Sequence, residues 1–146
     1  YEMSHHFFRI SKKYEIPSQI LVLIAKQESD FRLSIVRKVK GLIEMDNKYF
    51  PVEVGSDFCM MQINIVNIDI FKLDASRLLK EYSYCIESAA KILKAKKTAY
   101  EAREKDWFAR YHSSTKSVKE KYYRSIMDRW EKIDPVGSLP YLKMVK

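Results

Sequence analysis

The sequence predicts a mainly helical domain that carries a small β-hairpin region, an α+β arrangement in which helices dominate. Three observations lead to this fold class. Only 3 of the 146 residues are glycine, too few for the tight turns of a β-rich fold or for a glycine-rich phosphate loop. Hydrophobic residues make up 47% of the chain, enough to bury one core at this length. Strand-forming residues gather in one stretch, residues 30–64.

Two helices are expected near the N-terminus. Residues 2–14 set three apolar side chains among polar ones, a pattern typical of a short amphipathic helix. Pro17 and Ser18 favour the start of a second helix, because proline fits the first turn and serine can cap it. Residues 20–25 are apolar on all sides, so we expect this helix to cross the centre of the domain and to emerge at residues 26–29.

Residues 30–64 are expected to form two or three strands of a small hairpin. Strand formers occur here between residues that break strands. The strand formers are Val36, Val39, Tyr49, Phe50, Val52 and Val54. The expected breaks fall at Gly41, Asp46-Asn47, Pro51 and Gly55.

Two further helices are expected in the middle of the chain. Asp74 can cap a short helix that runs to Lys80. Ser83 opens a longer helix, in which apolar residues fall at helical spacing as far as Leu93.

Two more helices are expected after residue 105. Asp106 can cap a helix that contains Trp107 and Tyr111. Ser117 and Glu120 have the spacing of a capping box, in which each side chain satisfies a backbone N–H of the other residue.

The chain is expected to form one domain, residues 1–133, followed by a peripheral tail, residues 134–146. The last helix should end at about Ile133, because Pro135 cannot continue it. The longest apolar run is far shorter than the roughly 20 residues that cross a bilayer, so no transmembrane segment is expected. The sequence starts at Tyr1 and not at methionine, which is compatible with a mature form from which an export signal has been removed.

The basic residues are concentrated in the last third of the chain. The whole chain has 27 Lys+Arg and 19 Asp+Glu, a net charge of +8. Residues 91–132 hold 13 basic and 6 acidic residues, so this segment alone carries 13 − 6 = +7. Such a surface attracts nucleic acid, anionic lipid or an acidic cell-wall polymer, or is simply a solvated helical face.

The two cysteines leave two alternatives open. Cys59 and Cys85 are either one disulfide of an oxidising compartment or two small buried thiols.

Glu28 is the strongest candidate for a catalytic residue. It lies near the end of a helix whose preceding residues are apolar. A carboxyl held against apolar walls loses hydration of its charged form, which favours the protonated state that a general acid needs. From the pattern alone, an ordinary surface glutamate at a helix end is the simpler interpretation.

Four short segments around this position occur in a characteristic order: Glu28-Ser29, with Phe31 after it; Met60-Met61-Gln62-Ile63-Asn64; Ser88-Ala89-Ala90-Lys91-Ile92-Leu93; and Tyr111-His112-Ser113. This set resembles the lytic transglycosylases with the goose-type lysozyme fold. The family pattern is Glu-Ser, Gly-Leu-Met-Gln-Ile, a helix with Gly-Ala-x-x-Leu, and Tyr-Asn or Tyr-His. The sequence looks most like the small enzymes associated with type IV and type III secretion systems, and the resemblance covers residues 16–130.

The resemblance implies a lysozyme-like helical domain with its β-hairpin beside an active-site cleft. The substrate would be the β-1,4 bond between N-acetylmuramic acid and N-acetylglucosamine in peptidoglycan glycan strands. Glu28 alone would protonate the glycosidic oxygen and then deprotonate the C6 hydroxyl, which closes a 1,6-anhydro ring. Proteins of a secretion apparatus are further implied partners, and no cofactor, metal or nucleic acid is implied. Together with the absent initiator methionine, the resemblance implies an exported, periplasmic protein whose signal peptide has been removed.

The same resemblance assigns roles to the other motif residues. Gln62 and Asn64 would line the cleft and position the sugar, with Met61 packed beneath them. Tyr111 would form a hydrogen bond near Glu28. His112 would also contact substrate, at the position where the family usually has asparagine.

The sequence departs from the family pattern at several positions. Cys59 stands where the family has glycine, so its side chain is expected to restrict how closely the sugar approaches the backbone. Met60 replaces the leucine of the same motif, and Ala89 replaces the glycine of the third motif. The gap between Glu28 and Gln62 is longer than usual, and the extra residues would enlarge the hairpin beside the cleft.

A second catalytic carboxylate is an alternative that would favour hydrolysis, as in a lysozyme. The candidates are Asp30, Glu44, Glu53 and Asp57. Asp57 is the best placed of these, close to the Gln62 motif, although a role in a turn or cap is the simpler expectation.

The sequence also bears on a zinc site and on a non-catalytic binding function. A zinc site is not expected, because His5 and His6 are adjacent and His112 is the only other histidine. The alternative from a different class is a non-catalytic basic helical module that binds nucleic acid or a protein partner. Its support is the glycine-to-Cys59 departure and the +7 segment.

Overall fold

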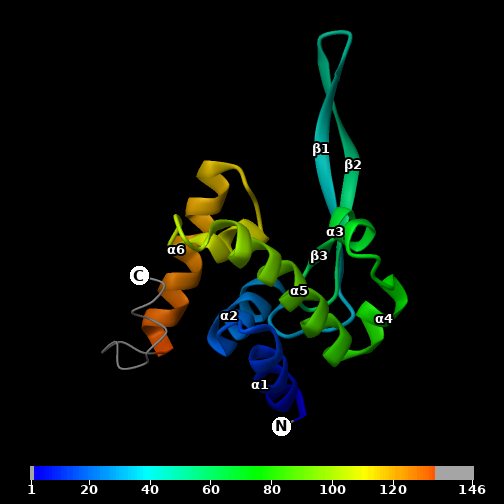
Figure 1. Cartoon of the computed structure of the whole chain (residues 1–146). Helices are drawn as coiled ribbons and strands as arrows, with labels where there is room; N and C mark the ends of the chain where they lie inside the picture. The colour runs from blue at the N-terminus through cyan, green and yellow to red at the C-terminus, as the bar shows by residue number, and fades with distance from the viewer. Residues whose placement is uncertain (1, 134–146) are drawn as a thin grey trace.

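The structure, a computed structural model, describes residues 2–133, and the expected tail at residues 134–146 lies outside the described residues. A helical body carries a long two-stranded hairpin that extends away from it (Figure 1). In chain order the elements are α1 (Glu2–Tyr14), α2 (Ser18–Ser29), β1 (Val36–Met45), β2 (Lys48–Phe58), β3 (Ile63–Asn64), α3 (Ile65–Ile70), α4 (Ala75–Lys80), α5 (Tyr82–Tyr100), the 3-10 helix η1 (Trp107–Tyr111) and α6 (Lys116–Ile133). The predicted fold class is confirmed.

Helix α2 lies at the centre of the body, as its apolar sequence predicts. It packs against α1, α5 and α6, and most of its residues between Ile20 and Ala25 are buried. The expected cap by Ser18 is wrong: Pro17 occupies the N-cap position and Ser18 is the first helical residue. The helix ends at Asp30, whose φ of 53° is left-handed and whose N–H bonds back to the last turn.

The sheet has three antiparallel strands in the order β1-β2-β3. Asp46 and Asn47 form a two-residue turn between the long strands, with φ of 52° and 59°, the geometry of a type I′ hairpin turn. Gly41, Pro51 and Gly55 lie within the strands, so the expected breaks at these residues are wrong. A two-stranded ribbon leaves one side of each strand unpaired, which is why it tolerates proline.

The helices between residues 64 and 100 follow the sequence with one addition. Asp74 accepts a hydrogen bond from the Arg77 N–H at 3.1 Å and caps α4, as predicted. Helix α5 starts at Tyr82, one residue before the expected start. The short helix α3 was not predicted, and its cap is Asn64, which accepts from the Val66 N–H at 2.9 Å.

Both caps expected after residue 105 are wrong. Asp106 occupies the N-cap position of η1 without a side-chain cap bond, and its carboxylate lies 3.4 Å from the Lys119 ammonium. Helix α6 begins at Lys116, so Ser117 lies inside the helix and forms no capping box with Glu120.

A disulfide joins Cys59, just after β2, to Cys85 in α5, which decides between the two alternatives for the cysteines. Both residues are fully buried. The bond fixes the base of the hairpin to the helical body. None of the helices within residues 2–133 combines the length and apolar character needed to cross a membrane.

Candidate active site

A furrow crosses the molecule where the end of α2 meets the base of the hairpin and η1. One part is a hollow of about 400 Å³. A second hollow of about 530 Å³ shares Glu28, His112 and Val118 with it. The first is lined by Glu28, Asp57, Gln62, Ile63, Asn64, Asn67, Lys96, Arg110, Tyr111, His112, Ser113 and Val118. Five of the six predicted site residues line it, and a larger hollow of about 580 Å³ beside Ile16 and Trp107 contains none of them.

Glu28 lies at the middle of this furrow, on the last turn of α2. The residue is only 8% exposed, because it follows closely after the buried apolar part of the helix. Its Oε1 has no hydrogen-bond partner among residues 2–133. The carboxyl is therefore held in place by its helix, while one of its oxygens remains available for an incoming group.

His112 is the nearest charged neighbour of Glu28. Its Nδ1 lies 3.6 Å from the Glu28 Oε1, and the Glu28 carboxylate raises the pKa of the imidazole, against the opposing effect of burial. The ring stacks on Tyr122 of α6, with centroids 4.5 Å apart and planes 3° from parallel. His112 is thus fixed by stacking, and it contacts Glu28 as well as lining the furrow.

Tyr122 is a site residue that the sequence reasoning missed. Its buried hydroxyl forms no hydrogen bond of good geometry within residues 2–133, but it lies close enough to the Glu28 carboxylate to interact with it. Burial and the Glu28 charge raise the pKa of this phenol well above its usual value, so it stays protonated. In the sequence, Tyr122 stands among apolar residues at helical spacing in α6. Nothing in that pattern separates it from an ordinary core tyrosine.

Asp57 lines the same hollow from the end of β2. The expected turn or cap role is wrong, because Asp57 pairs with Arg37 and Asn64 in the register of the sheet. Burial raises the pKa of its carboxyl, the hydrogen bond from Asn64 Nδ2 at 3.0 Å opposes this, and the Glu28 charge adds to it. The furrow therefore holds two carboxyl groups that influence each other.

The other carboxylate candidates lie outside the furrow's lining. Asp30 pairs with Lys26 on the surface, which lowers the pKa of its carboxyl. Glu44 is exposed beside the hairpin turn, and Glu53 lies opposite Lys40 within the hairpin.

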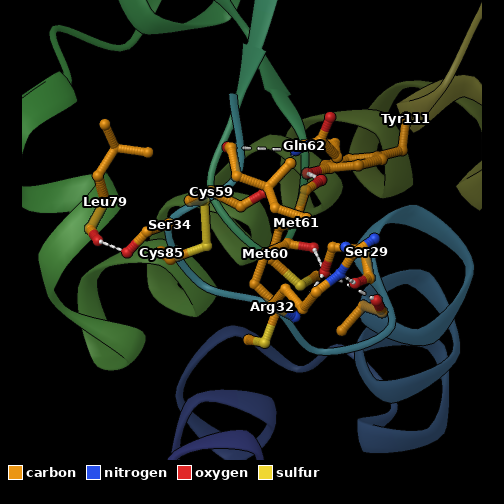
Figure 2. The surroundings of a disulfide bond; sticks show 12 residues. Ser29, Arg32, Ser34, Cys59, Met60, Met61, Gln62, Leu79, Cys85 and Tyr111 are labelled. Carbon is orange, nitrogen blue, oxygen red and sulfur yellow. Dashed lines mark hydrogen bonds between the residues drawn. A yellow bond between two sulfur atoms is a disulfide. The ribbon is translucent and has the colours of Figure 1, made fainter. Parts of the chain in front are cut away.

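The turn Cys59–Gln62 lies near Ser29 and Tyr111 (Figure 2), and Gln62 at its end lines the hollow together with Glu28. Met61 is fully buried and is not among the residues that line the hollow, and its carbonyl accepts a hydrogen bond from the Tyr111 hydroxyl at 2.5 Å. The Met60 carbonyl accepts from the Ser29 hydroxyl at 2.8 Å. Ser29, which follows Glu28 in sequence, and Tyr111, which lines the same hollow, are therefore both hydrogen-bonded to this turn.

Gln62 and Asn64 differ in what they offer a ligand. Gln62 is buried and donates from Nε2 to the Cys59 carbonyl at 2.8 Å, while its Oε1 lacks a partner in residues 2–133. Asn64 uses its oxygen to cap α3 and its nitrogen to bind Asp57. Gln62 can accept from a sugar hydroxyl, whereas Asn64 is occupied with holding Asp57 and α3.

The side chain of Cys59 does not enter the hollow. It is fully buried, bonded to Cys85, and not among the lining residues. The expected restriction on sugar approach is therefore wrong, and the non-catalytic alternative loses one of its two supports.

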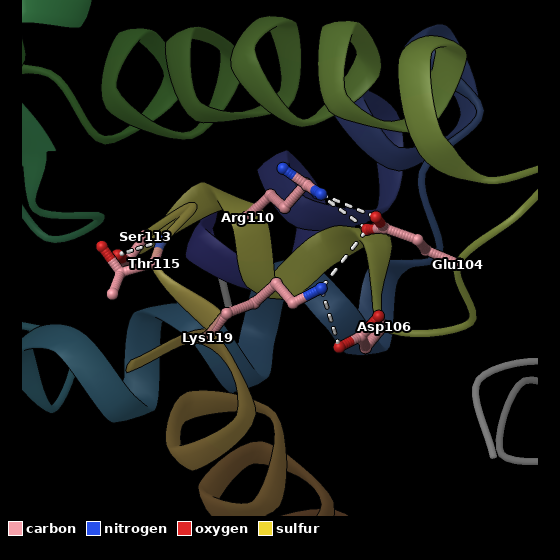
Figure 3. Close-up of polar contacts among 6 residues, drawn as sticks. All are labelled: Glu104, Asp106, Arg110, Ser113, Thr115 and Lys119. Atoms are coloured by element: carbon pink, nitrogen blue, oxygen red, sulfur yellow. Dashed lines mark hydrogen bonds and ion pairs between the residues drawn. The ribbon is translucent and has the colours of Figure 1, made fainter. Parts of the chain in front are cut away.

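An ion-pair network fixes η1, which carries Tyr111, to the start of α6 (Figure 3). Arg110 donates two hydrogen bonds to the Glu104 carboxylate, at 2.7 and 2.6 Å. Lys119 lies 3.5 Å from Glu104 and 3.4 Å from Asp106. These contacts, Arg110 first, lower the pKa of Glu104 to about 2.

Metal binding finds no support in this arrangement. Within residues 2–133, no group of three or more His, Cys, Asp or Glu side chains is placed to hold a metal ion.

A mainly helical domain with a small antiparallel sheet beside a furrow that holds a buried glutamate is consistent with a lysozyme-like domain. The family model of the transglycosylase SLT domain matches residues 5–129, so the chain belongs to this family. No curated protein and no solved structure matches the chain significantly. The family acts on peptidoglycan, outside the cytoplasm, as lytic transglycosylases.

Proposed function

We propose that Glu28 is the single acid and base of a peptidoglycan lytic transglycosylase. The observation that carries the proposal is its Oε1, buried at the middle of the furrow and without a hydrogen-bond partner within residues 2–133. In the described part of the chain the ion-pair partner of this carboxyl is His112, whose Nδ1 lies 3.6 Å away, beyond normal hydrogen-bond distance, so this contact does not hold the proton of the carboxyl. That proton is therefore available to a glycosidic oxygen that enters the furrow.

The reaction requires one proton to leave Glu28 and one to return. Glu28 protonates the oxygen between N-acetylmuramic acid and N-acetylglucosamine, and the bond from that oxygen to C1 breaks. The substrate's own N-acetyl carbonyl stabilises the positive charge at C1. The Glu28 carboxylate then removes the proton of the C6 hydroxyl, whose oxygen bonds to C1 and closes the 1,6-anhydro ring. Because the attack is intramolecular, no water has to be bound and activated.

The predicted site residues contribute to substrate binding in different ways. Gln62, Tyr111 and His112 contact the sugar, and Asn64 and Met61 support the residues around it. The free acceptor of Gln62 binds a sugar hydroxyl. Lys96 lines one hollow, and Arg37 and Lys121 line the other. Their positive charges suit the carboxylates of peptidoglycan on both sides of the cleaved bond.

The substitution Glu28→Gln tests this assignment. It preserves shape but cannot donate and recover a proton, so we expect at least a roughly hundredfold loss in the rate of peptidoglycan clearing. Circular dichroism should show an unchanged fold. The matched control is Glu15→Gln, which removes a carboxylate outside the furrow and should keep full activity. A folded Glu28→Gln variant with near-normal activity would falsify the assignment.

Hydrolysis is a second candidate outcome of the same site, favoured by the position of Asp57. A second carboxylate in the furrow can stabilise the charge at C1 or activate a water, which yields a reducing end. Mass analysis of released fragments distinguishes the two, because the anhydro product is one water lighter. If Asp57 directs hydrolysis, Asp57→Asn should shift the products toward anhydro ends. An unchanged product ratio would exclude Asp57 from this choice.

We also propose that the protein is exported and opens the wall for a secretion apparatus. This setting is supported by the resemblance of Tyr111-His112 and of the small domain to the secretion-associated enzymes. Cell fractionation of a tagged full-length protein tests the location. Pull-down of the tagged protein after crosslinking, with the Glu28→Gln variant as a stable bait, tests the partners. Recovery in the cytoplasmic fraction alone would contradict this setting.

A further inference from the structure

The turn that carries Gln62 has an unusual backbone. Cys59 has φ of 62° and Gln62 has φ of 50°, so both ends of the turn are left-handed without being glycine. The Gln62 N–H donates to the Cys59 carbonyl at 3.0 Å and closes the turn. The same carbonyl accepts from Gln62 Nε2 at 2.8 Å. The orientation of the Gln62 side chain therefore depends on the backbone at Cys59.

A left-handed cysteine needs support from its surroundings. An L-residue in this conformation brings Cβ close to its own backbone, and cysteine lacks the local hydrogen bond that helps Asn and Asp there. The Cys59 N–H donates to the Ile35 carbonyl at 2.9 Å, and its sulfur is bonded to Cys85 in the long helix α5. The disulfide is the covalent part of this support. Cys59 and Cys85 are the chain's only cysteines, so no other cysteine of the chain can replace either partner.

The remaining residues of the turn connect it to the candidate catalytic residue. Ser29, adjacent to Glu28, donates to the Met60 carbonyl, and Tyr111, adjacent to His112, donates to the Met61 carbonyl. Movement of the turn would therefore affect the Gln62 subsite first. Through these two hydrogen bonds it would then affect the ends of α2 and η1 (Figure 2).

We propose that the Cys59–Cys85 disulfide is a positioning element of the active site, so that full activity requires the oxidised protein. This proposal rests on the proposed function and adds a redox requirement to it. A dithiol reductant supplies two electrons and two protons, the S–S bond breaks, two thiols form, and the reductant becomes a disulfide. The turn then loses its tie to α5 while the left-handed strain at Cys59 remains. The Gln62 acceptor no longer holds its place in the hollow.

The experiment compares four states of the full chain: the oxidised protein, the same protein reduced with dithiothreitol, Cys85→Ala, and Cys59→Gly with Cys85→Ala. Glycine adopts the left-handed conformation without strain, so the double variant tests whether backbone geometry is what the disulfide provides. Kinetics on soluble glycan strands give kcat and KM separately. Hydrogen–deuterium exchange of the peptide covering residues 58–64 reports on the turn without using activity. The control variant is Ile10→Val, a conservative core change in α1, an element that forms no hydrogen bond with the turn in the described part of the chain.

We expect reduction and Cys85→Ala to raise KM about tenfold with a smaller fall in kcat, and to speed exchange at residues 58–64 about tenfold, since binding at Gln62 is lost first. Cys59→Gly with Cys85→Ala should recover most of both losses and be indifferent to reductant. Unchanged kinetics and exchange after complete reduction would overturn the proposal, as would equal losses in Ile10→Val. If the oxidised protein has no activity on glycan strands but exchange still responds, the proposed function fails and the positioning role stands.

Discussion

Replacement of His112 by asparagine, the residue that the family usually has there, should change how activity depends on pH. His112 is the one titratable side chain within ion-pair distance of Glu28 in residues 2–133. The two side chains are close enough for their protonation to be coupled, so the pH dependence of activity belongs to the pair as a whole. Because the pKa of His112 is raised above 6.5, the pair keeps its last proton until the pH rises through that higher value. The His112→Asn substitution keeps a hydrogen-bonding side chain at this position and removes the proton.

The size of the effect follows from the geometry. Two unit charges 3.6 Å apart interact by about 1 kcal/mol in water and about 5 kcal/mol at an effective dielectric constant of about 20. The His112 side chain is 44% exposed, so solvent screening places the interaction near the lower figure, at about 1–2 kcal/mol. Loss of this interaction, which favours the protonated pair, should move the alkaline limb of the activity profile to lower pH.

The measurement is kcat/KM on soluble glycan strands, taken across the range in which histidine titrates. The stability of the protein provides a second readout. A raised folded-state pKa means that the pair stabilises the wild type fully below pH 6.5 and loses this contribution as the pH rises through the raised value. The variant should lack that decline. An alkaline limb at the same pH in both proteins would refute the coupling of His112 to Glu28.

Two further predictions concern the supports of the site. Tyr111→Phe leaves the Met61 carbonyl without its 2.5 Å donor, so urea unfolding should show that the free energy of unfolding falls by about 1–3 kcal/mol. Activity should fall less than in Glu28→Gln. A larger loss of activity in Tyr111→Phe would mean that the roles of Glu28 and Tyr111 must be reassigned. The pKa of Glu104 is lowered to about 2, mainly by Arg110, so the wild type should lose stability as the pH falls from about 4.5 toward 2, and Glu104→Gln should flatten that decline in acid-unfolding curves.

The sequence predicted elements well where one local pattern decided the structure. The all-apolar segment 20–25 could only be buried, and the structure places it at the centre of the body. Asp74 precedes a short helix and caps it. The caps expected from Ser18 and Ser117 were wrong because the helix begins at or before the serine. A one-residue shift in the start is enough to convert a capping residue into an interior one.

The candidate site was predicted only as far as its motifs extend. Glu28, Gln62 and His112 converge because each lies at the end of an element that meets the furrow. The role of Asp57 stayed open between a second carboxylate and a turn or cap, and Tyr122 was not predicted, since both roles depend on strand register and helix packing between distant segments. The disulfide was undecidable for the same reason, as the distance between two cysteines 26 residues apart is set by the fold.

The two parts of the long hairpin, its base and its distal ribbon, affect the geometry of the site to different degrees. The register of β1 and β2 shifts between Val39 and Lys40, which separates a proximal part from a distal ribbon. The proximal part includes the pair Arg37 and Asp57, and only there does β3 join β2 as a third strand. A bulge changes the twist and breaks the continuity of the ladder, so distortions of the distal ribbon are poorly transmitted to the base. The geometry of the furrow is therefore set by the proximal part together with the turn that follows it, and the ribbon is free to differ in length without moving Asp57.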